Sequence, residues 1–355
     1  MKIIHTADLH IDSPLTSHLS AEKVRERRAE LFSTLSAMVE AATACGAAIM
    51  IIAGDLFDSD RITKTARRRT LSLIAAHGEI KFFYLPGNHE ELGLISGEDT
   101  LPDNLFVFGE EWTYFASDEL IIAGRSTTAS GMFEALSLPE DKRCVVVLHG
   151  ELRDRSDAGG VIGRRDAAGK NIDYLALGHY HSYSAERIDD RCTAVYAGTP
   201  EGRGFDETGE KGYVLVEDSG RGLSHRFVPF ARRRLHEISV DVSEASDLYT
   251  LERIAAAALI EVSPADLVRL VLTGRRVVGL NPDVAALTAR FAASFYYFEV
   301  RDETRLRISA ADYERDLSLK GEFIRMVMAD DSLSDKKKEE IIACGLAALL
   351  GEVAL

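Results

Sequence analysis

The sequence predicts an α/β fold with a parallel sheet, followed by a smaller α+β domain and C-terminal helices. Three short apolar runs, at residues 2–6, 49–53 and 82–85, have the length and side chains of buried strands. Two stretches with helical periodicity separate these runs, which gives the strand–helix–strand order typical of parallel sheets. A basic segment at 231–234 marks a change of composition, and the α+β pattern begins after it.

The first domain is expected to continue well beyond these strands. Segments 105–108, 112–115 and 120–123 are predicted to form a short antiparallel meander. Residues 153–170 combine charges with glycine and alanine and show no periodicity, which is typical of a long surface loop. The remaining elements are helices at 21–45 and 63–77, strands at 145–148 and 174–177, and hairpin-like strands near 182–188, 194–196, 212–216 and 224–228.

The second domain is predicted from alternating short strands and helices. Strands are expected at 237–242, 267–273 and 296–300, and helices at 248–259 and 282–291. Two more helical patterns, at 313–329 and 334–350, complete the chain. We therefore divide it into residues 1–230, 231–311 and 312–355. The last helices carry apolar stripes that either pack within their own domain or bind a partner: Leu317, Phe323, Ile324, Val327, Ile341, Ile342, Leu346 and Leu349.

Composition limits the classes of function. The chain has 355 residues, of which 46% are hydrophobic, and a formal net charge of -15. This charge argues against a free-standing non-specific DNA binder, which needs a basic face, but not against a nuclease whose metal ions supply positive charge. No apolar run is long enough to span a membrane, and no signal-peptide pattern is seen. The four cysteines form no CxxC pair, so buried reduced thiols and a cytoplasmic location are expected.

Acidic, amide and imidazole side chains follow five of the predicted strands. The carboxyl ends of parallel strands meet at one edge of a sheet, where ligands bind. A single histidine after a strand is commonly structural, but repetition at five strand ends points to a shared site. The residues concerned are Asp8 and His10; Asp55 and Asp58; Asn88, His89 and Glu90; His149; His179 and His181.

These side chains suit a pair of metal ions. Carboxylates, imidazoles and one amide without thiolates favour Mn²⁺, Fe²⁺ or Zn²⁺ over a structural zinc site. The candidates outnumber the ligands that one ion can hold. Two ions about 3.5–4 Å apart stabilise the attacking and leaving oxygens of a phosphoryl displacement and activate a bound water as hydroxide.

The motifs at these strand ends resemble those of calcineurin-like metallophosphoesterases, and within them the SbcD- and YhaO-like group of DNA-repair exonucleases. The similarity covers about residues 1–200. The group is further indicated by Tyr196-Ala197-Gly198-Thr199-Pro200 and the glycine-rich segment 204–212 after it. The resemblance implies a four-layer αββα sandwich, two metal ions that we expect to be Mn²⁺, a DNA substrate and an SbcC-like, SMC-type ATPase partner. It leaves open whether two copies form a homodimer.

The resemblance also assigns roles to the residues. His89 would face the scissile phosphate as a catalytic group, and Asp58 would orient His89 or, alternatively, cap the following turn. The ligands would be Asp8, His10 and His181 for the first ion, Asn88, His149 and His179 for the second, with Asp55 bridging both.

Three functions remain open at this level. The favoured one is a two-metal phosphodiesterase acting as a DNA exonuclease or endonuclease subunit. The second is a phosphatase or small-nucleotide phosphodiesterase, because the Gly-Asn-His-Glu motif ending at Glu90 also occurs in protein phosphatases. The third is a non-catalytic scaffold within an ATPase complex, which would have no need of His89.

Overall fold

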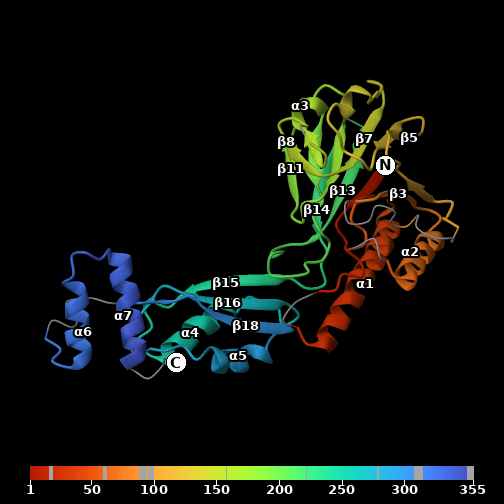
Figure 1. Ribbon diagram of the computed structural model, residues 1–355. Helices are drawn as coiled ribbons and strands as arrows, with labels where there is room; N and C mark the ends of the chain where they lie inside the picture. The colour runs from red at the N-terminus through yellow and green to blue at the C-terminus, as the bar shows by residue number, and fades with distance from the viewer. Residues whose placement is uncertain are drawn as a thin grey trace. The chain divides into compact units, whose positions relative to one another are not determined.

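Two six-stranded sheets form the centre of the first unit, Met1–Leu235, in the computed structural model (Figure 1). The structure describes residues 1–15, 19–58, 62–87, 94, 100–156, 158–220, 222–277, 280–307 and 315–349. The first sheet contains, in order, β14 (Leu223–Pro229), β13 (Gly212–Asp218), β1 (Lys2–Thr6), β2 (Ile49–Ala53), β3 (Lys81–Leu85) and β4 (Leu105–Val107). The second contains β11 (Ser184–Arg187), β12 (Thr193–Tyr196), β10 (Tyr174–Gly178), β7 (Arg143–His149), β6 (Leu120–Gly124) and β5 (Thr113–Ala116).

The two sheets share one apolar core and carry helices on their outer faces. Residues from both sheets, such as Ala53 and Val147, pack into a single buried cluster between them. Helices α1 (Ala21–Cys45) and α2 (Lys64–Ala76) cover the other face of the first sheet. The outer face of the second sheet packs on the short α3 (Arg164–Ala167) and the 3₁₀ turn η2 (Met132–Glu134). The predicted αββα sandwich is confirmed.

The helix boundaries follow from local chemistry. Ser20 begins α1, where its hydroxyl accepts a hydrogen bond from the Lys23 N–H at 3.3 Å. Gly46 ends the helix with a left-handed backbone (φ 71°), a conformation that glycine adopts without steric penalty. Thr63 caps α2 in the same way as Ser20 caps α1. These capped helices give the crossovers that a parallel β1–β2–β3 arrangement needs.

Two predictions of local structure were wrong. Segment 105–123 is not one antiparallel meander, because β4 pairs in parallel with β3 in the first sheet; only β5 and β6 form the expected antiparallel pair, in the second sheet. Segment 153–170 is not a structureless loop. It contains α3 and β9 (Val161–Gly163), which pairs in parallel with β8 (Glu151–Arg153), and it buries Ile162 and Ala167. These elements are too short to produce a periodic pattern.

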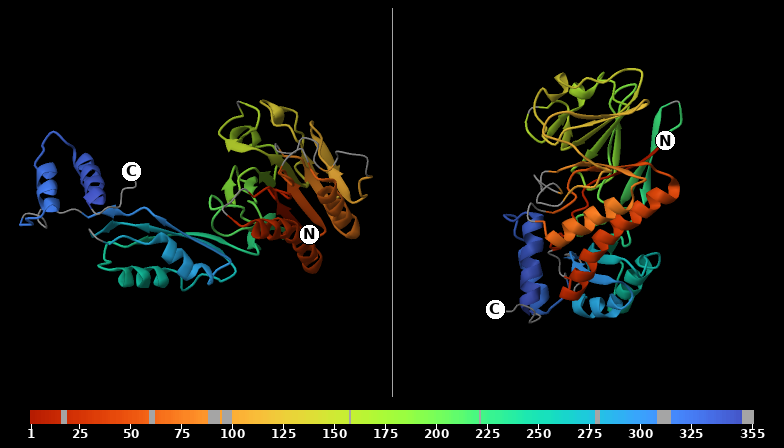
Figure 2. Two further views of the ribbon diagram at one scale, coloured as in Figure 1. Left: turned by 60° about the horizontal axis from the view of Figure 1, so that its bottom comes forward. Right: turned by 90° about the vertical axis from the view of Figure 1, so that its right-hand side faces the viewer.

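The second unit, His236–Leu355, is built on a three-stranded sheet. Its strands are β15 (Leu235–Asp241), β16 (Leu267–Thr273) and β18 (Tyr297–Asp302), and β16 and β18 are parallel. Helices α4 (Leu248–Ala258) and α5 (Val284–Ala292) lie on one face of this sheet (Figure 2). The short strands β17 (Arg275–Arg276) and β19 (Arg305–Leu306) form a separate two-stranded parallel sheet. This is the predicted α+β unit, while the three-part division of the chain stays a prediction.

Helices α6 (Leu319–Met328) and α7 (Asp335–Leu349) pack on each other. Ile324 and Val327 of α6 are buried against Ile342 and Leu346 of α7. Most of the apolar side chains in the two stripes therefore pack between the two helices. Among the described residues of this region, four large apolar side chains are exposed: Leu317, Leu319, Met326 and Leu349 are 96%, 72%, 66% and 46% exposed.

Two of the four cysteines match the expectation of buried thiols. Cys144 and Cys192 are free and buried, and burial raises their pKa values to about 11 and about 12. Cys45 is half-buried and Cys344 is exposed. Among the described residues, no helix has the length and apolar character required for a membrane span.

A buried histidine predicts how stability depends on pH. His5 lies between the sheets with its Nδ1 2.9 Å from the Tyr174 hydroxyl, and burial lowers its pKa from 6.5 to about 3. The unfolded chain would protonate His5 below pH 6.5 while the folded chain would not, so the free energy of unfolding should fall as pH decreases through this window. Between pH 7 and 5, His5 should account for roughly 2 kcal/mol.

Urea unfolding with EDTA present measures this effect without a contribution from metal. His5→Gln should lose less stability than the wild type over the same pH step, whereas His77→Gln, at the end of α2, should behave like the wild type. Equal pH slopes for the wild type and His5→Gln would contradict the prediction.

Candidate metal centre

The segments after β1 and β2 continue side by side beyond the sheet. The Asp8 N–H donates to the Gly54 carbonyl and the His10 N–H donates to the Asp55 carbonyl, both at 3.0 Å. The second sheet approaches the same point, since the His179 N–H lies 3.0 Å from both carboxylate oxygens of Asp8. The ends of β1, β2 and β10 therefore converge, although they belong to two sheets.

Four of the predicted ligands have an unusual backbone. Asp8, His10, Asp55 and His179 have φ values of 51°, 46°, 49° and 109°. Residues with a side chain rarely adopt positive φ, and strain of this kind costs about 1–3 kcal/mol per residue. It is found mainly at functional sites, where the surrounding structure holds it in place.

Five predicted ligands form two groups whose donor atoms could each hold a metal ion. One group is Asp8, His10 and His181, and the other is Asp8, Asp55 and His149. Within each group the donor atoms lie within 4.8 Å of one another. Asp55 Oδ2 is 3.4 Å from His149 Nε2 of its own group and 3.9 Å from His10 Nε2 of the other group.

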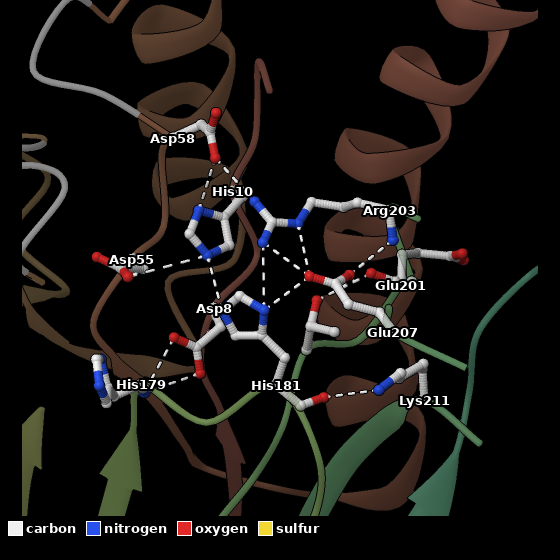
Figure 3. A network of polar contacts seen from close by, with 12 residues as sticks. Asp8, His10, Asp55, Asp58, His179, His181, Glu201, Arg203, Glu207 and Lys211 are labelled. Atoms are coloured by element: carbon white, nitrogen blue, oxygen red, sulfur yellow. Dashed lines mark hydrogen bonds and ion pairs between the residues drawn. The ribbon is translucent and has the colours of Figure 1, made fainter. Parts of the chain in front are cut away.

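The histidines of these groups all present Nε2 to the centre. His10 Nδ1 lies 2.9 Å from the Asp58 carboxylate, and His181 Nδ1 lies 2.7 Å from that of Glu207 (Figure 3). His149 Nδ1 lies 2.9 Å from the Ala53 carbonyl. Carboxylates and carbonyls only accept hydrogen bonds, so in the neutral, metal-binding form of these rings the proton lies on Nδ1 and Nε2 offers its lone pair to a metal.

The electrostatics also fit a bound cation. Asp8 and Asp55 are buried side by side, and burial raises the pKa of Asp8 to about 7. Burial opposes a charge on His149, but its contact with Asp55 and the nearby Asp8 raise its pKa to about 9. A proton on His149 thus compensates carboxylates that a divalent ion would neutralise more fully.

The other predicted site residues belong to neither ligand group or lie outside the described residues. His179 lies beside His149, with ring centroids 5.5 Å apart, but belongs to neither ligand group. Asp58 contacts His10 and Arg203. Asn88, His89 and Glu90 lie outside the described residues, and so does the predicted contact of Asp58 with His89.

Sequence reasoning missed a set of charged residues that contact the predicted site residues but belong to neither ligand group. Arg203, Glu207 and Lys211 come from the glycine-rich segment that precedes β13. Arg203 binds Asp58 and Glu207 at 2.8 Å each, and the Lys211 ammonium donates to the His181 carbonyl at 2.8 Å (Figure 3). The available signal was a run of alternating charges and glycines directly before a buried strand.

A cleft of about 900 Å³ opens beside the second ligand group. Gly87, His149 and His179 line it on one side, together with the charged residues Glu151 and Arg153. Arg153 pairs with the Glu151 carboxylate at 2.7 Å, so the lining of the cleft carries both signs of charge.

Gly54 allows the two sheets to approach closely at the centre. A Cβ at this position (φ 92°) would lie 2.0 Å from His149 Nδ1. Gly54→Ala should therefore displace the His149 ring and weaken metal binding by about 10–100-fold, as measured by calorimetric titration with Mn²⁺.

Gly46→Ala is the matched control for this substitution. Gly46 also has positive φ (71°), but an added Cβ would meet nothing within 4 Å. This variant should lose about 1 kcal/mol of stability and keep its metal affinity. Equal metal affinity for both variants would contradict the steric argument.

Comparison with known proteins agrees with the family resemblance of the sequence motifs. The family model described as calcineurin-like phosphoesterase matches residues 1–183. YhaO of Bacillus subtilis (strain 168), described as an uncharacterized metallophosphoesterase, is 29% identical over 277 residues, which are 71% of this chain and 65% of YhaO. The DNA double-strand break repair protein Mre11 of Methanosarcina acetivorans is 25% identical over 253 residues, which are 64% of this chain and 39% of Mre11.

The chain thus spans less than two thirds of the length of each of these relatives. Among solved structures, TT1561 of Thermus thermophilus is similar with a TM-score of 0.44 and 13% identity, over 64% of this chain and 98% of TT1561.

Proposed function

Since the chain belongs to the calcineurin-like phosphoesterases, we propose that it is a two-metal phosphodiesterase that hydrolyses DNA. Members of this family are metal-dependent hydrolases that use two divalent metal ions, and this chain has candidate ligand groups for them. The proposal concerns the substrate and the identity of the ions. We propose Mn²⁺, with Fe²⁺ and Zn²⁺ as alternatives, because nitrogen and oxygen donors without thiolates suit these ions.

One observation carries the proposal: the two ligand groups share Asp8, and Asp55 of the second group also faces His10 of the first. Ions bound here would supply Lewis acidity and an activated water, the chemistry needed to displace a phosphoester oxygen. In the proposed assignment, Asp55 bridges the ions and His89 acts on the scissile phosphate. Asp8, His10 and His181 would hold one ion, and Asn88, His149 and His179 the other.

The choice of DNA as substrate is supported by the similarity to Mre11, whose name describes DNA double-strand break repair. The net charge of -15 means that DNA binding would depend on the ions, on local cations such as Arg153 in the cleft, or on a partner. This argument favours action as one subunit of a DNA repair complex, and the proposed location of that complex is the cytoplasm.

We further propose an SbcC-like, SMC-type ATPase as the partner, with the exposed side chains of Leu317, Leu319 and Met326 as its docking surface. Exposed apolar side chains on a helix pair commonly mark protein interfaces. The same side chains would serve a homodimer, which sedimentation of the purified protein would detect.

The test is a substrate panel with Mn²⁺-loaded protein: linear DNA, hairpin DNA, bis-p-nitrophenyl phosphate and p-nitrophenyl phosphate. Cleavage of DNA and of the diester is expected. Turnover of the monoester alone would replace the nuclease assignment with a phosphatase. No turnover by protein that holds two ions would favour the scaffold.

A further inference from the structure

Resting on the proposed two-metal site, we propose that Arg203 is a positioning residue that selectively supports the ion held by Asp8, His10 and His181. Arg203 would not touch this ion. It would act through the two carboxylates that orient the histidine ligands, and its Nη2 also lies 3.2 Å from Nδ1 of His181.

One guanidinium group holds both carboxylates. Arg203 Nη1 donates to Asp58 Oδ1 at 2.8 Å, and Nη2 donates to Glu207 Oε1 at 2.8 Å. The backbone N–H of Arg203 also donates to Glu207 Oε2 at 2.7 Å. Asp58 in turn contacts His10, and Glu207 accepts from His181. The two histidines therefore share a single support, although they are far apart in the sequence (Figure 3).

The second ligand group is supported differently. His149 is oriented by the Ala53 carbonyl at 2.9 Å, a main-chain group of β2 that needs no side chain to hold it. In the part of the centre that the structure describes, the two groups are unequal: carboxylates contact Nδ1 of His10 and His181, whereas a main-chain carbonyl contacts Nδ1 of His149. A carboxylate partner increases the donor strength of an imidazole and fixes its tautomer.

Charge balance explains why an arginine is required at this point. Asp58 and Glu207 are partly or fully buried and both face ligand histidines, so their negative charges need a counterion. The planar guanidinium presents donors in two directions at once, which a lysine ammonium cannot match in geometry. Without Arg203 the carboxylates would repel each other and turn towards water, and His10 and His181 would lose their fixed orientation.

The experiment is Mn²⁺ titration of metal-free protein, followed by calorimetry and by electron paramagnetic resonance, with no substrate present. Wild type should bind two ions with the spectrum of a coupled pair. Arg203→Met should weaken one of the two binding steps by about 10–100-fold and show the spectrum of a single isolated ion when half loaded. Arg203→Lys should recover part of the affinity, because an ammonium can still reach one carboxylate.

Arg191→Met is the matched control. Arg191 is buried to a similar degree and binds Asp173 with two hydrogen bonds, but neither residue contacts a predicted ligand. This variant should bind both ions as the wild type does. Unchanged binding of both ions by Arg203→Met, or equal weakening of both, would overturn the proposal.

Glu207→Gln provides an independent test if Arg203→Met does not fold. The amide keeps the shape of the side chain but removes the charge, so the same binding step should weaken. If both single variants fold, the double variant should weaken binding by less than the product of the two single effects, because the pair acts as one unit. A wild type that binds fewer than two ions would instead contradict the proposed function.

Discussion

Replacing Asp55 with asparagine should abolish hydrolysis and reduce metal content below two ions per chain. The Asp55 carboxylate lies between His10 and His149, and its left-handed backbone (φ 49°) keeps it there. An asparagine has one oxygen where the aspartate has two, and no negative charge to balance the ions. Since the loss of a residue that orients a ligand already costs about 10–100-fold in metal affinity, the loss of the proposed bridging ligand should cost more. Metal analysis after gel filtration, together with diester hydrolysis, measures both effects.

Asp12→Asn is the control for this experiment. Asp12 also has positive φ (74°) and follows β1, but its carboxylate binds Arg28 at 2.6 Å and belongs to neither ligand group. This variant should keep both ions and its activity. If Asp55→Asn also retained both ions, Asp8 would be the better candidate for the bridge, because Asp8 belongs to both groups.

The sequence was sufficient to identify residues that follow buried strands. Asp8, Asp55, His149 and His181 were predicted from apolar runs that end in a polar residue, and all four lie in the ligand groups. The reason is that a strand buried on both faces leaves few positions for a polar side chain other than its end. Their assignment to particular ions stays a prediction.

Contacts between distant segments could not be predicted in this way. Nothing in residues 105–123 indicates that the chain leaves one sheet after β4 and enters the other at β5. Similarly, the contact of His181 with Glu207 depends on how the glycine-rich segment folds back, and local patterns do not encode that path. The resemblance pairs Asp58 with His89, which lies outside the described residues, and the contacts of Asp58 with His10 and Arg203 were not foreseen.

Replacing His89 with glutamine should reduce DNA hydrolysis by roughly 10²–10⁴-fold while both ions stay bound. This prediction rests on the resemblance of the motif, since His89 lies outside the described residues. An imidazole facing the scissile phosphate can protonate the leaving oxygen or stabilise the charge that develops on the phosphate. Glutamine can donate a hydrogen bond but cannot transfer a proton at neutral pH.

Two substrates distinguish these roles of His89. The leaving alkoxide of DNA needs a proton, whereas p-nitrophenolate from bis-p-nitrophenyl phosphate leaves as a stable anion. If His89 is a general acid, His89→Gln should slow DNA cleavage much more than cleavage of the nitrophenyl diester. Equal losses would instead indicate charge stabilisation, since both substrates develop the same charge on the phosphate. Loss of an ion would show that His89 is a ligand, and His77→Gln, a change outside the centre, should alter neither rate.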